Sequence, residues 1–272
     1  MSELPAGWTP HEGPLASISR GSGPRLVFVH GFTQTGRSWL PVAEAFVADH
    51  ECVLVDAPGH GRSSHVRADL RLGADMIAKV GGRATYVGYS MGGRFVLHLA
   101  LAYPHLVRSL VLLSTTAGIS ADDERNQRRS ADETLAAEIE DEGVDSFLTK
   151  WLAQPMFASL PEYARGLDDR STNTAAGLAN SLRMAGTGAQ LPLWDRVRWI
   201  TAPTLVMAGV LDAKFAAQGA QLANAIGANA VYRPIGAAGH AANLEQPFTV
   251  ANEIRAWLIA NKQNPGQAQE VP

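Results

Sequence analysis

A serine stands among glycines in the sequence VGYSMGGR at positions 87–94. The segment before it reads as a short apolar strand and the segment after it as a helix, so Ser90 would occupy the turn between them. Gly88, Gly92 and Gly93 suit the crowding and the positive φ that such a sharp turn demands. A Gly-rich turn without chemistry is the alternative. The G-x-S-x-G pattern predicts an exposed nucleophile or base beside the unpaired amides of a helix N-terminus.

A serine hydroxyl is a poor base or nucleophile at neutral pH, so it needs a nearby imidazole and an acid that fixes the tautomer of that imidazole. Asp212 follows the strand-like segment 204–209, and His240 lies in the loop after the strand-like segment that ends at Ile235. A helix N-cap before 213–226 is the alternative for Asp212, and an exposed loop position is the alternative for His240. The chain order Ser, Asp, His, with each residue after a strand, predicts a catalytic triad.

Two backbone amides could complete the site. The tripeptide HGF follows the strand-like segment 26–29 and ends at Phe32, whose amide the turn could aim at the candidate serine. With the amide of Met91 it would form an oxyanion hole. The sequence DAPGHGRS at 56–63 also follows a strand, and we expect His60 to be architectural, because no second ligand has a spacing that suits a metal site. We expect no metal and no cofactor.

The length and charge of the chain exclude some classes of binding partner. With 272 residues and a formal net charge of −3, the chain is long enough for one α/β domain with an insertion and has no electrostatic footprint for nucleic acid or an anionic membrane. The N-terminal sequence lacks the basic start and apolar core of a signal peptide, so we expect a cytoplasmic protein. The single cysteine, Cys52, excludes an internal disulfide and is expected to pack as a small hydrophobe. We expect a monomer or a small homo-oligomer.

Short apolar runs alternate with helical segments along much of the chain. The strand-like runs are mostly unalternated, which is typical of strands buried on both faces; they are 26–29, 52–55, 84–87, 110–113, 204–208 and 231–235. Amphipathic helical segments separate several of them, at 37–49, 91–103 and 248–260. This alternation predicts an α/β fold with a mostly parallel, doubly wound sheet.

The strand rhythm stops between residues 120 and 200, where helix-forming residues predominate at 130–143, 144–152 and 178–185. We interpret 120–200 as a helical lid inserted into a core formed by 25–119 and 201–261. Residues 1–24 read as an N-terminal extension with one edge strand at 15–18, and 262–272 as a flexible tail.

The motifs HGF, DAPGHGRS, GYSMGG, the Asp212 region and GHAANLEQP make the chain resemble the α/β-hydrolase superfamily over residues 25–260. Further features resemble one family on this fold, the 2-succinyl-6-hydroxy-2,4-cyclohexadiene-1-carboxylate synthases of menaquinone biosynthesis. These features are Tyr89 and Arg94 at the elbow, WLAQPMFASL at 151–160, DRSTN at 169–173 and LDAKF at 211–215. This resemblance implies a carbon–oxygen lyase on a hydrolase scaffold, which eliminates pyruvate from a small cyclohexene tricarboxylate without an acyl-enzyme.

The resemblance also implies residue roles. Ser90 would abstract the proton beside the succinyl ketone of the substrate, and the two candidate amides would hold the enolate oxygen. A tricarboxylate in a partly dry pocket needs cationic partners; the matching arginines are Arg94, Arg128 and Arg170, with Arg125 and Arg129 as neighbouring candidates for the second, and the pocket walls are Tyr89, Trp151 and Phe157. Ordinary surface or lid-core positions are the alternative for each of these side chains.

Two other functions are compatible with the same motifs. A serine hydrolase of esters or carbon–carbon bonds, of the meta-cleavage product type, would use the same triad with water admitted. A ligand-binding protein would keep the triad as a vestige and use the lid as a partner surface. Inward-facing arginines would argue against the hydrolase, and measurable turnover would exclude the binding protein.

Overall fold

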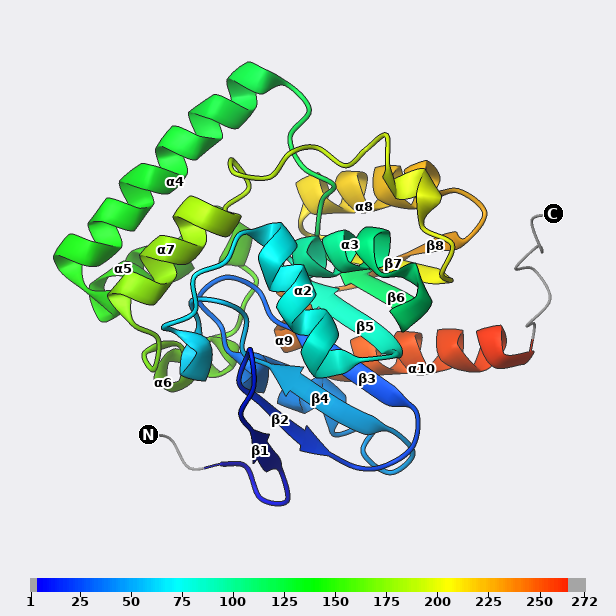
Figure 1. Cartoon of the computed structure of the whole chain (residues 1–272). Helices are drawn as coiled ribbons and strands as arrows, with labels where there is room; N and C mark the ends of the chain where they lie inside the picture. Colours follow the sequence, from blue (N-terminus) through cyan, green and yellow to red (C-terminus); the bar gives the residue numbers. More distant parts are fainter. Residues whose placement is uncertain (1–3, 264–272) are drawn as a thin grey trace.

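The computed structural model describes residues 4–263, and within them eight strands form one mixed sheet (Figure 1). The strands are β1 Thr9–His11, β2 Ser17–Arg20, β3 Arg25–Val29, β4 Glu51–Val55, β5 Ala84–Tyr89, β6 Val107–Leu113, β7 Thr204–Gly209 and β8 Ala230–Ile235. Their order in the sheet is β1-β2-β4-β3-β5-β6-β7-β8. The pairings from β4 to β8 are parallel, and β1 and β2 are antiparallel additions at one edge. The predicted mostly parallel sheet is confirmed.

Helices cover both faces of this sheet, because successive side chains of a strand point to opposite sides. On β3, Val27 and Val29 belong to the apolar layer that contains α2 and α3, whereas Leu26 and Phe28 belong to the layer that contains α1 and α10. The helices of the two layers are α1 Leu40–Ala43, α2 Leu70–Gly81, α3 Met91–Ala102, α8 Ala213–Ile226, α9 Ala242–Glu245 and α10 Pro247–Gln263. Helices on both faces make the sheet doubly wound.

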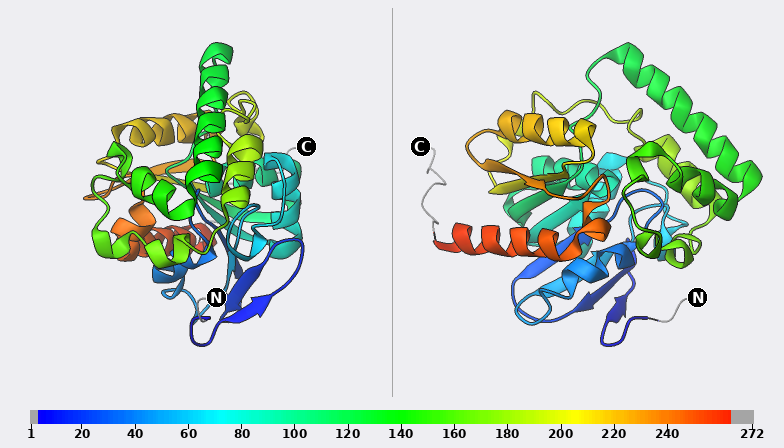
Figure 2. Two further views of the ribbon diagram at one scale, coloured as in Figure 1. Left: turned by 90° about the vertical axis from the view of Figure 1, so that its left-hand side faces the viewer. Right: turned by 180° about the vertical axis from the view of Figure 1, so that it is seen from behind.

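A helical insertion separates β6 from β7 and packs over one end of the sheet (Figure 2). Its helices are α4 Asp122–Glu142, α5 Val144–Leu152, α6 Leu167–Arg170 and α7 Ala175–Ala185. From this insertion, Trp151 and Leu182 join the same apolar cluster as Tyr89 and Leu113, which end two central strands. The insertion therefore lies over the carboxyl ends of the strands. No helix within residues 4–263 is long and apolar enough to cross a membrane.

The predicted helix at 37–49 is wrong in its backbone, although its apolar face is buried as expected. The segment forms a 3-10 turn, η1 at Gly36–Trp39, and then the single turn α1. Beyond Ala43 the amides of Ala45 and Phe46 bond to carbonyls three residues back, which is the tighter 3-10 pattern. The other 3-10 turns are η2 Gly61–Ser63, η3 Pro104–Leu106, η4 Pro155–Phe157, η5 Glu162–Ala164 and η6 Val197–Trp199.

The chain ends also differ from expectation. The N-terminal segment contributes two strands rather than one, and β2 spans Ser17–Arg20 rather than 15–18; Leu15 and Ala16 are buried but precede the strand. At the other end, residues 262–263 belong to α10, so the predicted flexible tail begins too early. The rest of that tail, 264–272, lies outside the described residues. The pattern also failed to reveal α2, which the structure forms between β4 and β5.

Candidate active site

The turn that carries Ser90 is sterically demanding. Ser90 has φ 51° and ψ −110°, a left-handed backbone conformation that a residue with a side chain adopts only under constraint. The sequence led us to expect positive φ at the neighbouring glycines, but only Ser90 has it, and the glycines serve close approach instead. A Cβ on Gly92 would lie 2.1 Å from the carbonyl oxygen of Val29, and one on Gly88 would lie 2.6 Å from that of Gly92. The elbow therefore needs glycines because α3 packs directly on β3 and β5.

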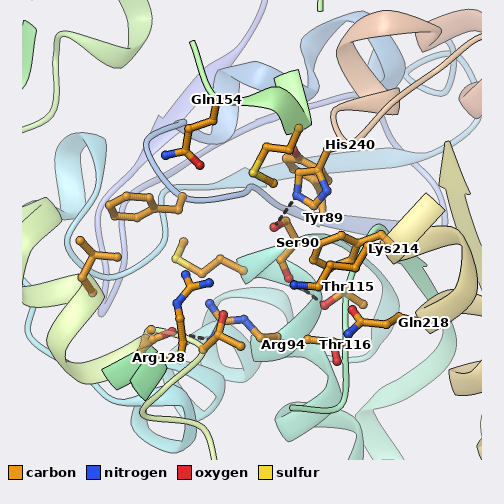
Figure 3. A pocket seen from close by; sticks show the side chains of 18 of the residues that line it. Tyr89, Ser90, Arg94, Thr115, Thr116, Arg128, Gln154, Lys214, Gln218 and His240 are labelled. Atoms are coloured by element: carbon orange, nitrogen blue, oxygen red, sulfur yellow. Dashed lines mark hydrogen bonds between the residues drawn. The ribbon is translucent and has the colours of Figure 1, made fainter. Parts of the chain in front are cut away.

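Ser90, His240 and Asp212 meet at the carboxyl ends of their strands, and Figure 3 shows Ser90 beside His240. The Nε2 atom of His240 lies 3.1 Å from the Ser90 Oγ, and its Nδ1 lies 2.8 Å from the Asp212 Oδ2. The imidazole is almost fully buried, with 1% exposure. Because residues that follow parallel strands gather at one sheet edge, β5, β7 and β8 bring the three side chains together from distant parts of the chain.

The carboxylate of Asp212 forms hydrogen bonds with two residues, His240 and Phe215. Its Oδ1 accepts the amide of Phe215 at 3.2 Å and so caps the N-terminus of α8, while its Oδ2 faces His240. The N-cap and triad interpretations of this residue are therefore both compatible with its geometry. Burial by itself raises the pKa of Asp212, but the hydrogen bonds from His240 and the Phe215 amide outweigh it and hold the pKa below its usual value. The carboxylate can therefore stay ionised and hold the imidazole in one orientation.

The amides of Phe32 and Met91 are available beside Ser90. Within residues 4–263 neither amide donates to an acceptor of the chain, and both residues line the same cavity as Ser90. A fixed turn holds the Phe32 amide, because Thr33 has φ 67° and its amide donates to the His60 Nε2 at 3.3 Å. The side chain of Asn173 donates to the Thr33 carbonyl at 2.8 Å. A turn fixed in this way satisfies the main requirement for a preorganised oxyanion hole.

Two buried imidazoles support that turn from below. The rings of His30 and His60 lie 5.0 Å apart, and the His30 Nε2 accepts the amide of Ala57 at 3.0 Å. Burial lowers the pKa of His30 to about 4 and that of His60 to about 3. Both rings are therefore neutral near pH 7 and can accept backbone N–H donors. His60 joins the HGF turn to the loop after β4, as its predicted architectural role requires, and the structure groups no three potential metal ligands within residues 4–263.

A cavity of about 450 Å³ opens above Ser90, between the sheet edge and the helical insertion. Ten of the predicted site residues line it: Phe32, Tyr89, Ser90, Met91, Arg94, Arg128, Trp151, Phe157, Asp212 and His240. Aromatic rings form much of the wall around the imidazole. The ring of Phe32 lies 5.3 Å from that of Trp151, and those of Tyr89 and Phe157 lie 5.4 and 6.1 Å from that of His240. Such a lining excludes water from the reacting groups.

Two guanidinium groups face the cavity. Arg94 is only 7% exposed, and the sole hydrogen bond of its guanidinium group among the described residues runs from Nη1 to the Ala185 carbonyl at 2.6 Å. Burial and the nearby charge of Arg128 lower the pKa of Arg94 to about 10. Arg128 pairs with Asp132 through Nε, at 2.7 Å. A buried cation without a carboxylate partner is costly, so this end of the cavity is suited to an anion.

The structure distinguishes the three neighbouring arginines of α4. Arg128 lines the cavity, whereas Arg125 pairs with Asp122 at the start of α4 and Arg129 lies outside the lining. Residue 128 is therefore the only one of the three whose position fits the implied carboxylate contact. One i,i+4 pair, from Arg128 to Asp132, fixes its side chain along the helix.

Arg170 differs from expectation, because it does not line the cavity. It is 2% exposed, donates through Nε to the Arg165 carbonyl at 2.7 Å, and bonds through Nη1 to the Thr33 hydroxyl. Its Nη2 has no partner among the described residues, and burial lowers its pKa to about 10. The side chain packs against the turn that follows HGF, where its guanidinium group contacts the Thr33 hydroxyl. In this geometry it acts on the site through the turn rather than by lining the pocket.

Sequence reasoning missed several polar residues of the lining, namely Thr115, Thr116, Gln154, Lys214 and Gln218. Thr115 donates from its hydroxyl to the Ser90 carbonyl at 2.8 Å and so holds the elbow from β6. Lys214 stands only two residues after Asp212, so its closeness to a triad residue was the available signal. The threonines gave none, because they follow a strand that carries no triad residue.

Comparison with known proteins agrees with this geometry. Residues 24–247 match the family model described as alpha/beta hydrolase fold. A Bacillus subtilis relative named as a 2-succinyl-6-hydroxy-2,4-cyclohexadiene-1-carboxylate synthase is 34% identical over 92% of this chain and 93% of its own. The synthase of that name from Escherichia coli O1:K1 is 32% identical over 86% of this chain and 94% of its own.

Solved structures point the same way. The structure of MenH from S. aureus superposes with a TM-score of 0.85 at 28% identity, covering 90% of this chain and 98% of that one. A thermophilic esterase from Thermogutta terrifontis, at 24% identity and a TM-score of 0.78 over 90% of this chain and 93% of its own, shows only the shared fold. The chain belongs to the α/β-hydrolase fold family and, within it, to the family of 2-succinyl-6-hydroxy-2,4-cyclohexadiene-1-carboxylate synthases.

Proposed function

We propose that the protein is a carbon–oxygen lyase of menaquinone biosynthesis. It eliminates pyruvate from 2-succinyl-5-enolpyruvyl-6-hydroxy-3-cyclohexene-1-carboxylate and releases 2-succinyl-6-hydroxy-2,4-cyclohexadiene-1-carboxylate. The observation that carries the proposal is the combination of a Ser-His-Asp unit with the buried, carboxylate-free guanidinium of Arg94 in one cavity. A hydrolase of neutral esters has no need of such a cation.

The reaction begins with proton removal. The Oγ of Ser90, whose own proton passes to the His240 Nε2 at 3.1 Å, takes the proton from the ring carbon beside the succinyl ketone. The electrons of that C–H bond shift toward the ketone, and the amides of Phe32 and Met91 stabilise the enolate oxygen. Asp212, held ionised, stabilises the imidazolium that forms.

Elimination completes the cycle. The enolate re-forms its carbonyl as a new double bond forms between ring carbons 2 and 3. The existing double bond moves from carbons 3 and 4 to carbons 4 and 5, and the bond from carbon 5 to the enolpyruvyl oxygen breaks. The departing enol oxygen takes a proton, and the released enolpyruvate becomes pyruvate in solution. The proton taken from the ring carbon stays on Oγ and restores the serine hydroxyl, and the proton held by the His240 Nε2 goes to the departing oxygen, which returns the imidazole to its neutral form. No bond forms between serine and substrate, so no acyl-enzyme arises.

The remaining assignments belong to the same proposal. Arg94 and Arg128 bind the terminal carboxylate of the succinyl arm, and Tyr89, Trp151 and Phe157 enclose it. Residues 120–200 act as a lid over the core formed by 25–119 and 201–261. The partner is a small tricarboxylate, with no nucleic acid or membrane, and the protein works in the cytoplasm as a monomer or small homo-oligomer.

A direct assay tests this function. Purified protein is incubated with the enzymatically prepared cyclohexene substrate, and pyruvate is followed with a coupled dehydrogenase. We expect pyruvate release well above the spontaneous rate, together with slow or no hydrolysis of simple aryl esters. Vigorous ester turnover without pyruvate release would favour a hydrolase instead. Ligand binding without any turnover would favour a binding protein.

A further inference from the structure

Lys214 is a third cation in the cavity lining, and the proposed reaction has so far given it no role. It lines the cavity from α8, and within residues 4–263 it forms no ion pair; its Nζ lies 6.0 Å from the centroid of the Phe215 ring. Asp212, the carboxylate nearest in sequence, has both oxygens engaged, by His240 and by the Phe215 amide. The charge of Lys214 helps to lower the pKa of Asp212, but its exposed ammonium group forms no ion pair with a carboxylate of the described residues.

The position of Lys214 in α8 is itself unfavourable. The helix begins at Ala213, no acidic residue lies in its first turn, and Lys214 is its second residue. A cation at a helix N-terminus opposes the helix dipole, whereas an anion there is stabilised. The Asp212 carboxylate caps this N-terminus, and a ligand carboxylate beside Lys214 would add a second favourable charge there.

Gln218 stands one turn later on the same helix face and also lines the cavity. Its Oε1 is buried and has no hydrogen-bond partner among the described residues. Figure 3 shows Lys214 and Gln218 entering the cavity from the α8 side and Arg128 of α4 on the other side of the view, with Arg94 between Arg128 and Gln218. The cavity thus has cationic groups on its α8 side and on its α4 side.

The substrate of the proposed function has a matching charge pattern, and the inference rests on that function. Its ketone has a carboxylate two carbons away along the succinyl arm. A second carboxylate, on ring carbon 1, is separated from the ketone by ring carbons 1 and 2, on the other side of the ketone. With the ketone oxygen at the Phe32 and Met91 amides, one carboxylate falls toward Arg94 and Arg128, and the other toward α8.

We propose that Lys214 binds the ring carboxylate of the substrate and, with Gln218 beside it, forms a second anionic subsite opposite the arginine pair. The subsite selects molecules that carry carboxylates on both sides of a ketone. Lys214 contacts the same carboxylate before and during proton removal, so it contributes uniform binding and acts mainly on KM.

A pair of unreactive probes tests the subsite without turnover. 4-Oxoheptanedioate carries a carboxylate two carbons from each side of its ketone, and 4-oxoheptanoate lacks one of them. By calorimetry we expect the wild-type protein to bind the diacid about tenfold more tightly than the monoacid. Lys214→Met should abolish this preference and Lys214→Arg should retain it. Lys79→Met, which removes an exposed lysine of α2 outside the cavity, should leave it unchanged.

Kinetics and stability provide further readouts. With the cyclohexene substrate, Lys214→Met should raise KM about tenfold and change kcat less than about threefold. Its ligand-free Tm should equal or exceed that of wild type, because a cation leaves a helix N-terminus. An unchanged preference for the diacid, or a lowered ligand-free Tm, would overturn the proposal. Absence of pyruvate release by wild type, with diacid selectivity lost only in Lys214→Met, would refute the lyase function and leave the subsite standing.

Discussion

Asp212 forms a hydrogen bond with His240 and also caps the N-terminus of α8, so the triad and this helix are held by the same carboxylate. The Oδ2 of Asp212 lies 2.8 Å from the His240 Nδ1, and its Oδ1 accepts a hydrogen bond from the backbone amide of Phe215 in the first turn of α8. The Phe215 ring in turn packs edge-on against His240, with the ring centroids 4.4 Å apart. Any movement of the helix would therefore tilt the imidazole. This coupling explains how a loop histidine remains within reach of Ser90.

Removing either end of the proton-transfer pair should abolish activity. Ser90→Ala and His240→Ala are expected to lower kcat by roughly 10³-fold or more, because no other group in the cavity can accept the ring proton in the same position. Pyruvate release in the coupled assay measures the loss. Circular dichroism of each variant checks that the fold persists. A folded variant that keeps near wild-type turnover would refute the assigned chemistry.

Arg94 and Arg128 should carry substrate binding, and their neighbour Arg129 should not. Arg94→Ala is expected to cost about 2–5 kcal/mol in kcat/KM, the range for truncating one partner of a desolvated charge pair. Arg128→Ala should also raise KM, while Arg129→Ala, adjacent in α4 but outside the cavity lining, serves as the matched control. Equal effects at residues 128 and 129 would contradict the observed orientation of α4.

Because α3 packs closely on β3, a side chain at Gly92 should destabilise the fold. A Cβ at Gly92 would meet the Val29 carbonyl oxygen at 2.1 Å, whereas nothing lies within 4 Å of one at Gly236. Gly92→Ala should therefore lower the free energy of unfolding by about 3 kcal/mol, and Gly236→Ala should change it little. Urea unfolding of the two variants measures the difference. Similar midpoints for both would show that α3 can shift away from the sheet without cost.

Acid should destabilise the protein through its buried histidine pair. The pKa values of His30 and His60 lie at about 4 and 3 in the folded chain, below the value of about 6.5 for an unfolded histidine. Between these limits the unfolded chain binds more protons, so the free energy of unfolding falls as pH decreases, by on the order of a few kcal/mol for the pair. Urea titrations at pH 7 and pH 5 measure this slope.

A histidine variant isolates the source of that slope. His60→Gln removes one of the two buried groups and should flatten the dependence of stability on pH, even though the variant is less stable at pH 7. The exposed His65 provides the control, since His65→Gln should retain the wild-type slope. A wild-type slope in His60→Gln would assign the acid sensitivity to other groups.

Much of the fold followed from local pattern. Apolar runs located the six strands β3 to β8. The five inner ones are largely buried and therefore mostly apolar, whereas β8 lies at the edge of the sheet and is partly exposed. The helix predicted at 37–49 was wrong because periodic burial of residues such as Trp39 and Phe46 does not distinguish an α-helix from successive 3-10 turns. The strand β1, with all three residues exposed, carried no apolar signal.

The sequence by itself determined the chemistry available at the site, because the types and order of Ser90, Asp212 and His240 follow from motifs that sit at strand ends. Tertiary structure alone decided which cations line the cavity. Arg128 rather than Arg129 faces the cavity, Arg170 turns behind the Phe32 turn, and Lys214 enters from α8. The physical reason is that local spacing fixes the helix or strand that carries a side chain. The surroundings of that side chain depend on segments distant in the sequence, as the contact between Arg170 and Thr33 illustrates.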